Sequence, residues 1–309
     1  MRKMSADKDW KEYTNGNVRV FINVYDGTKI RTTMDDEFQA VFPESVDMKI
    51  TNHCRMGCVM CHEGSTEDGE HADLSNLGET FLSTMSPYTE VAIGGGAATS
   101  HPQIEELLKY LKEKNILANI TVHERELLDN IKRVKKWVRE DLVKGVGVSI
   151  HSEFNKGVCD FAKKHKNTVL HVIAGHTPMN VIDQYGKKGL KLLILGYKNL
   201  RRGADNYTKH KKNIEEKIGE MERNIDRLFM EFAVVSFDNL ALRQLNVKEH
   251  VSEKIWNTCY QGSDATHTMY IDMVKKEFAA TSTSAERYEL KDTIDEMFAV
   301  VKGTMDHMI

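Results

Sequence analysis

The sequence predicts an α/β fold built on a partial (β/α)6 barrel, with a β-hairpin before it and a helix and hairpin extension after it. Two observations support this prediction. Short apolar segments alternate with charged amphipathic segments through the middle of the chain, which requires a parallel sheet covered by helices. The alternation provides six strands, fewer than the eight that close a full barrel.

The first predicted element lies in an N-terminal extension, residues 1–45. Residues 18–33 alternate apolar and polar side chains on both sides of Asp26-Gly27. This dipeptide supplies the positive φ angles of a tight turn. The extension is therefore expected to contain a β-hairpin.

The barrel core is predicted to span residues 46–203. Its first helix is indicated by Ile104, Leu107, Leu108 and Leu111, which recur on one helical face. The six strand-like segments are residues 46–52, 90–96, 118–123, 145–151, 169–175 and 190–196. Active sites of such sheets lie at the carboxyl ends of the strands.

A C-terminal cap, residues 204–309, is expected to pack on the core. Residues 206–232 are strongly charged but carry a narrow apolar seam, which predicts one long helix. Residues 269–284 alternate around Lys275-Lys276 and predict a second hairpin, and residues 292–302 predict a closing helix.

Composition sets limits on the function. The formal net charge is -3, so no overall charge favours a nucleic-acid partner, although none is excluded. The first residues lack the apolar segment of a secretory signal, and no later stretch has the length of a membrane span. We therefore expect a cytoplasmic protein that does not enter a membrane.

Three cysteines, Cys54, Cys58 and Cys61, follow the first core strand without a fourth partner in the same stretch. A purely structural thiolate site normally takes four protein ligands. A [4Fe-4S] cluster on three cysteines instead leaves one iron free to bind a small molecule. The alternative is a zinc site completed by His62, or by the distant Cys159 or Cys259, although no second cysteine cluster exists.

The motif Cys54-x-x-x-Cys58-x-x-Cys61, followed one strand and helix unit later by "GGGAATSHP", resembles the radical S-adenosylmethionine (radical SAM) enzymes over about residues 45–200. The resemblance implies that the cysteines bind a [4Fe-4S] cluster and that S-adenosylmethionine chelates the fourth iron. Only Cys159 and Cys259 remain elsewhere in the sequence, so a single cluster is expected. Met60 stands where the family packs a side chain on the adenine.

Further cofactor contacts follow from the same resemblance. Gly94, Gly95 and Gly96 stand at the family's Gly-Gly-Glu-Pro position, whose backbone approaches the methionine amino group. The stretch "HVIAGHTP" resembles the family's Gly-x-Ile-x-Gly-x-x-Glu strand. The resemblance thus implies adenine or backbone contacts from Ile173, Ala174 and Gly175, and ribose contacts from Ser149 and His151.

The implied chemistry is reductive cleavage of S-adenosylmethionine to a 5′-deoxyadenosyl radical, which abstracts hydrogen from a small-molecule, nucleotide or peptide substrate. Such an oxygen-sensitive oxidoreductase, transferase or isomerase needs an external electron donor, such as a flavodoxin or ferredoxin-like protein. His123 and Asp272 are candidate substrate contacts. Basic residues within 197–212 could meet a phosphate or nucleic acid, but a solvated helix start explains them as well.

Two other functions stay open at this stage. The first is an activase that uses the same radical to install a glycyl radical on a partner protein. The second is a non-catalytic zinc or iron-sulfur binding module. Metal analysis separates the second from both enzymes, and dependence of S-adenosylmethionine cleavage on one particular protein identifies the first.

Overall fold

A computed structural model describes residues 9–35 and 37–305, and residues 1–8, 36 and 306–309 lie outside the described residues. The N-terminal part forms an antiparallel sheet in the order β1-β2-β3. These strands are β1 Trp10–Asn15, β2 Val18–Asn23 and β3 Lys29–Thr32. The predicted hairpin is confirmed as β2 and β3, with Gly27 at a φ of 78°.

Strand β1 is not among the predicted strands. Its side chains are mostly polar, so the apolar alternation that marks a half-buried strand is weak. It nevertheless pairs along its whole length with β2, from Trp10 opposite Asn23 to Asn15 opposite Val18. The overlooked signal is Asn15-Gly16, a second tight-turn dipeptide, in which Gly16 adopts a φ of 62°.

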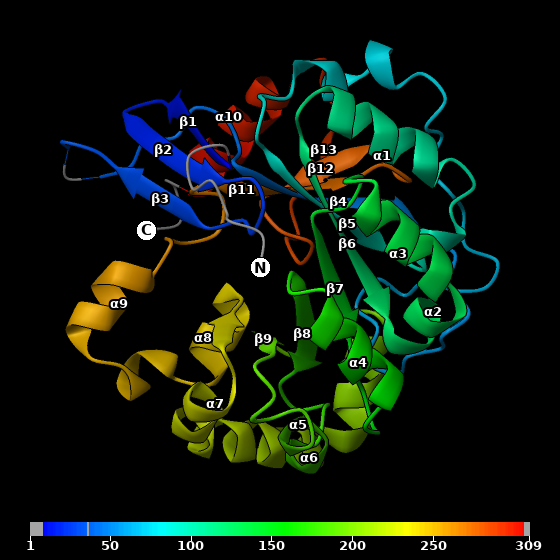
Figure 1. Cartoon of the computed structure of the whole chain (residues 1–309), viewed down its shortest axis with the longest axis vertical. Helices are drawn as coiled ribbons and strands as arrows, with labels where there is room; N and C mark the ends of the chain where they lie inside the picture. The colour runs from blue at the N-terminus through cyan, green and yellow to red at the C-terminus, as the bar shows by residue number, and fades with distance from the viewer. Residues whose placement is uncertain (1–8, 36, 306–309) are drawn as a thin grey trace.

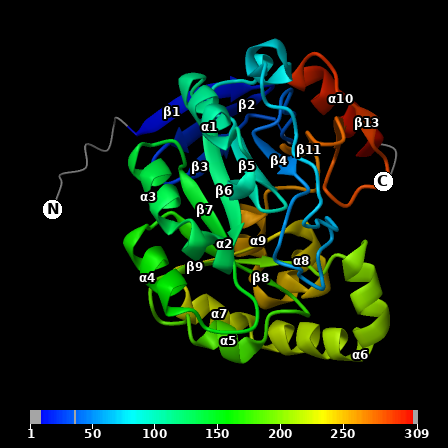
Figure 2. The same cartoon turned by 90° about the vertical axis from the view of Figure 1, so that its right-hand side faces the viewer.

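All six predicted core strands are present as parallel neighbours in sequence order. They are β4 Ser45–Thr51, β5 Glu90–Gly95, β6 Leu117–His123, β7 Gly145–Ser149, β8 Thr168–Ile173 and β9 Lys191–Leu195. The helices between them are α1 Ile104–Glu113, α2 Glu124–Asp129, α3 Ile131–Arg139, α4 Lys156–Lys164 and α5 Met179–Asp183. These helices cover the outer side of the curved sheet (Figures 1 and 2).

The central sheet continues beyond these six strands in both directions. β10 Val234–Phe237 adds in parallel to β9, and β11 Thr268–Asp272 adds in parallel to β4. β12 Glu277–Ala279 and β13 Tyr288–Glu289 then follow as antiparallel strands. The sheet order runs from β10 to β13 without these two pairing in the described part of the chain, so the barrel is partial.

The predicted second hairpin is confirmed as β11 and β12, with Lys276 at a φ of 57° in the turn. The hairpin is not part of a separate cap, because β11 is a strand of the central sheet and is buried on both faces. β10 was not predicted, since its four residues, two exposed and two half-buried, give little periodic signal. The region 204–309 therefore supplies strands to the core sheet as well as helices.

The prediction of one long helix over residues 206–232 is wrong. The structure has two helices, α6 Arg202–Arg223 and α7 Ile225–Glu231, separated at Asn224. The side-chain amide of Asn224 donates a hydrogen bond to the backbone carbonyl of Glu220, 2.7 Å away, so it caps the end of α6. The break still leaves the predicted seam residues Ile214, Met221, Ile225 and Leu228 buried.

The remaining helices follow in the C-terminal region. α8 Asn239–Gln244 and α9 Glu253–Cys259 lie beyond β10, and α10 Ile294–Met305 confirms the predicted closing helix. Short 3-10 turns are η1 Leu77–Glu79, η2 Phe81–Thr84, η3 Ala98–Ser100 and η4 Val247–His250. Within the described ranges, none of the helices has both the length and the apolar character needed to cross a membrane.

A buried ion-pair network joins the N-terminal sheet to the central sheet. Glu44 is fully buried, and its carboxylate lies 2.8 Å from Arg31 Nη2 and 3.3 Å from Lys29 Nζ. Lys29 also lies 2.9 Å from Glu90. Burial alone would raise the pKa of Glu44, but the charges of Lys29 and Arg31 hold it below its ordinary value.

Replacing Glu44 with glutamine is expected to destabilise the protein by about 3–5 kcal/mol, because Arg31 then loses its buried carboxylate partner and Lys29 loses one of two. The folded-state pKa of Glu44 is lowered, so its contribution is complete above the unfolded value and is lost as the pH falls below it. Urea denaturation at pH 7 and pH 3 measures the free energy of unfolding. The difference between Glu44→Gln and wild type should be smaller at pH 3 than at pH 7. Glu12→Gln, on the exposed Arg19 pair, should change stability little, and an equal effect of both variants would contradict the account.

Candidate functional site

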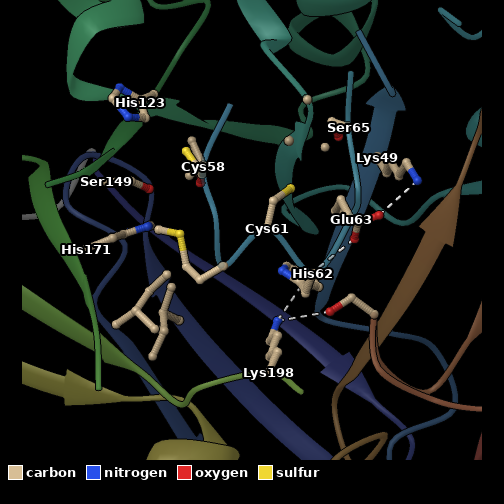
Figure 3. Close-up of a pocket in the computed structure, with 18 of the residues that line it drawn as sticks. Lys49, Cys58, Cys61, His62, Glu63, Ser65, His123, Ser149, His171 and Lys198 are labelled. Atoms are coloured by element: carbon tan, nitrogen blue, oxygen red, sulfur yellow. Dashed lines mark hydrogen bonds and ion pairs between the residues drawn. The ribbon is translucent and has the colours of Figure 1, made fainter. Parts of the chain in front are cut away.

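A cavity of about 460 Å³ opens at the inner side of the central sheet and its carboxyl ends. The loop after β4 places Cys54, Cys58 and Cys61 on its wall. Cys58 and Cys61 point into it opposite Ser149 and His171 (Figure 3). A volume of this size lies within the range of ordinary ligand pockets.

Backbone hydrogen bonds shape the cysteine loop. The Cys54 amide donates to the Thr66 carbonyl at 2.7 Å, and the Cys61 amide donates to the Cys58 carbonyl at 3.2 Å. Gly57, between the first two cysteines, adopts a φ of 66°. All three cysteines are free and half-buried, so the loop directs three thiols at one space.

The surroundings of the thiols determine their charge. Burial raises the pKa of Cys54, and it raises the pKa of Cys58 to about 11, reinforced by the neighbouring cysteines. Arg202 acts in the opposite direction on both. A bound cation is therefore needed to hold these groups as thiolates.

The glycines at the end of β5 form a second wall of the cavity. A Cβ atom on Gly94 would meet no atom within 4 Å, so this residue leaves open space. Gly95 adopts a φ of 112°, and a Cβ on Gly96 would lie 2.2 Å from the His53 carbonyl oxygen. Gly95 and Gly96 are thus required for the close approach to the cysteine loop, whereas Gly94 keeps the cavity clear.

Imidazoles gather where β6, β7 and β8 end. The rings of His123 and His151 stack at 4.3 Å, and His151 Nδ1 lies 3.3 Å from His176 Nε2. Burial lowers the pKa of His123 to about 4 and, together with the neighbouring His123 and His176, lowers that of His151 to about 3. These rings are therefore neutral at pH 7 and able to donate or accept hydrogen bonds.

The structure brings most of the predicted site residues together. Those lining the cavity are Cys54, Cys58, Met60, Cys61, Gly94, Gly95, Gly96, His123, Ser149, His151 and Ile173. Ala174 and Gly175 do not line it. Ala174 is buried in the core, and a Cβ on Gly175 would lie 2.7 Å from Ile214, so Gly175 allows α6 to pack closely on the end of β8.

The solved structures with a similar fold include three structures of two proteins. SuiB from Streptococcus suis, bound to S-adenosylmethionine, superposes with a TM-score of 0.60 at 12% identity, over 96% of this chain and 89% of that chain. SuiB bound to precursor peptide SuiA gives 0.59 at 12% identity, over 94% and 87%. The protein anSMEcpe with bound AdoMet gives 0.52 at 13% identity, over 82% and 79%.

SuiB and anSMEcpe are radical SAM enzymes. This chain has the radical SAM fold. No protein-family model matches the sequence, and no curated protein matches it. The structural likeness therefore identifies the fold, and the site residues must indicate the chemistry.

The cysteine loop fits the cluster that the radical SAM fold carries. Cys159 is buried in α4 and Cys259 is exposed on α9, and neither lines the cavity. The His62 ring is held by Glu63 Oε1 at 3.3 Å and Lys198 Nζ at 3.5 Å. The loop thus presents three thiols without a fourth cysteine.

A second possible set of metal ligands borders the same cavity. The ligand atoms of Cys58, His123 and His151 lie within 4.8 Å of one another, and His151 Nε2 has no hydrogen-bond partner in the described part of the chain. This set uses one of the three cysteines and leaves Cys54 and Cys61 without a role. It differs from the zinc site considered from the sequence, which used all three cysteines, and metal analysis has to exclude both.

An ion-pair network that sequence reasoning missed lies beside the cysteine loop. Lys49 Nζ lies 2.8 Å from Glu63 and 3.0 Å from Asp272, and all three side chains are buried. Asp272, predicted to contact substrate, is thus part of this ion-pair network and does not line the cavity. The signal in the sequence was a lysine at an inward position of β4, between the apolar Met48 and Ile50.

Three basic residues of the 197–212 segment support the site. Lys198 Nζ donates to Ser282 at 3.0 Å, Arg201 donates to the His62 carbonyl at 2.6 Å and Arg202 donates to the Cys58 carbonyl at 3.2 Å. Lys209, Lys211 and Lys212 are exposed. Arg201 and Arg202, at the start of α6, therefore hold the cysteine loop in place through its carbonyl groups, and we call these two residues the clamp.

Arg202→Met should loosen the cysteine loop, because it removes both a charged hydrogen bond to Cys58 and a positive charge near two thiolates. We expect iron to leave the reconstituted protein roughly 10-fold faster when a chelator is added under anaerobic conditions. Arg223→Met, at the exposed far end of α6, is the matched control. Equal iron release from both variants would show that the clamp has no influence on the metal.

Proposed function

We propose that this protein is a radical SAM enzyme that binds a [4Fe-4S] cluster through Cys54, Cys58 and Cys61 and cleaves S-adenosylmethionine reductively. The observation that carries the proposal is the set of three free thiols on one cavity, beside glycines of which Gly94 leaves open space. The radical SAM fold supports it.

When bound and reduced, the cluster and S-adenosylmethionine supply a 5′-deoxyadenosyl radical, whose role is to abstract hydrogen from a substrate. The protein contributes position and exclusion of water. Met60 packs with Tyr197 and Ile214, and Ile173 lies against the same group. We assign this apolar wall to the adenine, and Ser149 and His151 to the ribose hydroxyls.

The backbone at Gly94, Gly95 and Gly96 is assigned to the amino group of the methionine part. The sequence has no glutamate after these glycines, so contacts here come from the main chain. Gly96 and Ala97 already donate their amides to Thr51 and His53, both at 2.7 Å. These bonds hold the glycine wall at a fixed distance from the cysteine loop.

The substrate is a small molecule, a nucleotide or a peptide, and a peptide is favoured by the likeness to SuiB, which binds precursor peptide SuiA. We also assign an external flavodoxin or ferredoxin-like electron donor and a cytoplasmic location, because the reaction needs low-potential electrons and protection from oxygen. These assignments belong to the proposal and depend on the cluster chemistry.

The test is anaerobic reconstitution with iron and sulfide, followed by reduction with dithionite in the presence of S-adenosylmethionine. We expect a brown protein, and chromatography should detect 5′-deoxyadenosine. A colourless protein that contains zinc without sulfide and forms no 5′-deoxyadenosine would instead identify a non-catalytic metal module.

A further inference from the structure

One wall of the cavity carries charge that the cysteine site does not use. Asp47 lies on the inward face of β4, two residues before Lys49. Lys198 follows β9, and Asp238 follows β10. All four residues line the same cavity as the three cysteines.

These groups come from distant parts of the sheet. In the sheet order, β5 to β8 separate β4 from β9. The Asp47 carboxyl nevertheless interacts electrostatically with both the ammonium of Lys198 and the carboxylate of Asp238. The curvature of the sheet therefore turns the three charges toward one space.

Asp47 is the unusual member of this wall. Its side chain accepts no hydrogen bond and forms no ion pair within residues 9–35 and 37–305. It is open to the cavity but otherwise surrounded by protein, and burial raises the pKa of its carboxyl. A carboxylate that is exposed on a cavity wall and has no protein partner is free to pair with a cation of a bound ligand.

The sign of the missing charge follows from the neighbours. Lys49 is neutralised by Glu63 and Asp272. Among the described residues, Asp238 accepts the backbone amides of Gly196 at 2.9 Å and Ala241 at 2.7 Å and forms no ion pair. Two carboxylates, Asp47 and Asp238, therefore face a single ammonium, that of Lys198, so the wall lacks one positive charge.

We propose that Asp47, with Asp238 beside it, binds a protonated amine of the substrate. This inference rests on the proposed function, because it places the amine-bearing part of the substrate in the cavity where the radical would form. A neutral or anionic substrate would leave Asp47 unpaired, whereas an amine completes the charge balance. The amine is either a lysine side chain of a peptide or part of a small free amine.

The test is calorimetric titration of the reconstituted protein, in the presence of S-adenosylmethionine, with three probes: Nα-acetyl-lysine methylamide, pentylamine and the neutral Nα-acetyl-norleucine methylamide. We expect the lysine probe to bind about 10-fold to 100-fold more tightly than the norleucine probe. Asp47→Asn should remove that preference. Comparable binding of pentylamine identifies a small amine as sufficient, and binding of the lysine probe alone identifies a peptide.

Equal affinities of wild type for the lysine and norleucine probes would overturn the proposal, as would a preference that persists in Asp47→Asn. Asp160→Asn is the matched control, because Asp160 forms an exposed ion pair with Lys156 on α4 and should keep the preference. Thermal unfolding adds a second readout. Asp47→Asn should unfold at the same or a higher temperature, and a marked decrease would assign the carboxylate a structural role instead.

The two proposals fail in different ways. If unsubstituted protein forms no 5′-deoxyadenosine after reconstitution, the proposed function is wrong whatever the probes do. If it forms 5′-deoxyadenosine but does not distinguish lysine from norleucine, only the amine site is wrong.

Discussion

Cys58→Ala is expected to abolish 5′-deoxyadenosine formation and to leave the reconstituted protein nearly colourless. Cys58 supplies one of three thiols on the cavity wall, and two thiolates do not retain a cluster against a chelator. The raised pKa of this thiol shows that the free protein does not hold a thiolate there without a cation. Iron, sulfide and 5′-deoxyadenosine measured on the same sample check the prediction.

Two control variants make this prediction specific. Cys259→Ala removes an exposed cysteine outside the cavity and should keep full iron content. His123→Ala removes a ring from the alternative set of Cys58, His123 and His151, and it should also keep the iron. Loss of metal in His123→Ala with normal metal in Cys54→Ala would favour the zinc site over the cluster.

The second large effect is expected for Gly94→Val. The new side chain enters open space on the cavity wall, where the methionine part of S-adenosylmethionine is assigned. We expect 5′-deoxyadenosine formation to decrease by about 100-fold or more, because even a small displacement of the reacting groups has effects of that size. Iron content and thermal stability should stay normal, since valine is favourable in a strand.

Gly78→Val is the matched control for this substitution. A Cβ at Gly78 also meets nothing within 4 Å, but this residue lies in η1, away from the cavity. The variant should form 5′-deoxyadenosine at the wild-type rate. Normal product formation by Gly94→Val would mean that the nucleoside does not occupy the glycine wall.

The strands of the core could be predicted because each carries its signal locally. Short apolar runs ending in glycine or polar residues gave β4 to β9, and Asp26-Gly27 gave the first hairpin. The cysteine spacing likewise lies within one loop. Local patterns of this kind do not depend on the rest of the chain, so sequence reasoning is reliable for them.

The remaining features depend on contacts between distant residues. β11 joins β4 across more than half of the chain, and no local pattern specifies that partner. Lys49 on β4 can pair with Asp272 on β11 only because these two strands are neighbours in the sheet. Arg202 reaches the cysteine loop in the same way, from the start of a helix that its charge pattern marks as a solvated surface.

The inward positions of β4 show both limits of sequence reasoning. Asp47 and Lys49 alternate with the apolar Val46, Met48 and Ile50 of β4, which indicates two charged side chains on the inner face. Their different roles could not be predicted. Lys49 pairs with two carboxylates, whereas the Asp47 side chain forms no ion pair or hydrogen bond within the described residues. Only the folded chain distinguishes a buried ion pair from a free binding group.

The central claim is that three cysteines leave one iron for S-adenosylmethionine. Its most direct test is electron paramagnetic resonance of the dithionite-reduced, reconstituted protein before and after addition of S-adenosylmethionine. We predict the signal of a reduced [4Fe-4S] cluster whose shape changes when S-adenosylmethionine binds. A cluster signal that S-adenosylmethionine leaves unchanged, or a protein that holds zinc and gives no cluster signal, would contradict the claim.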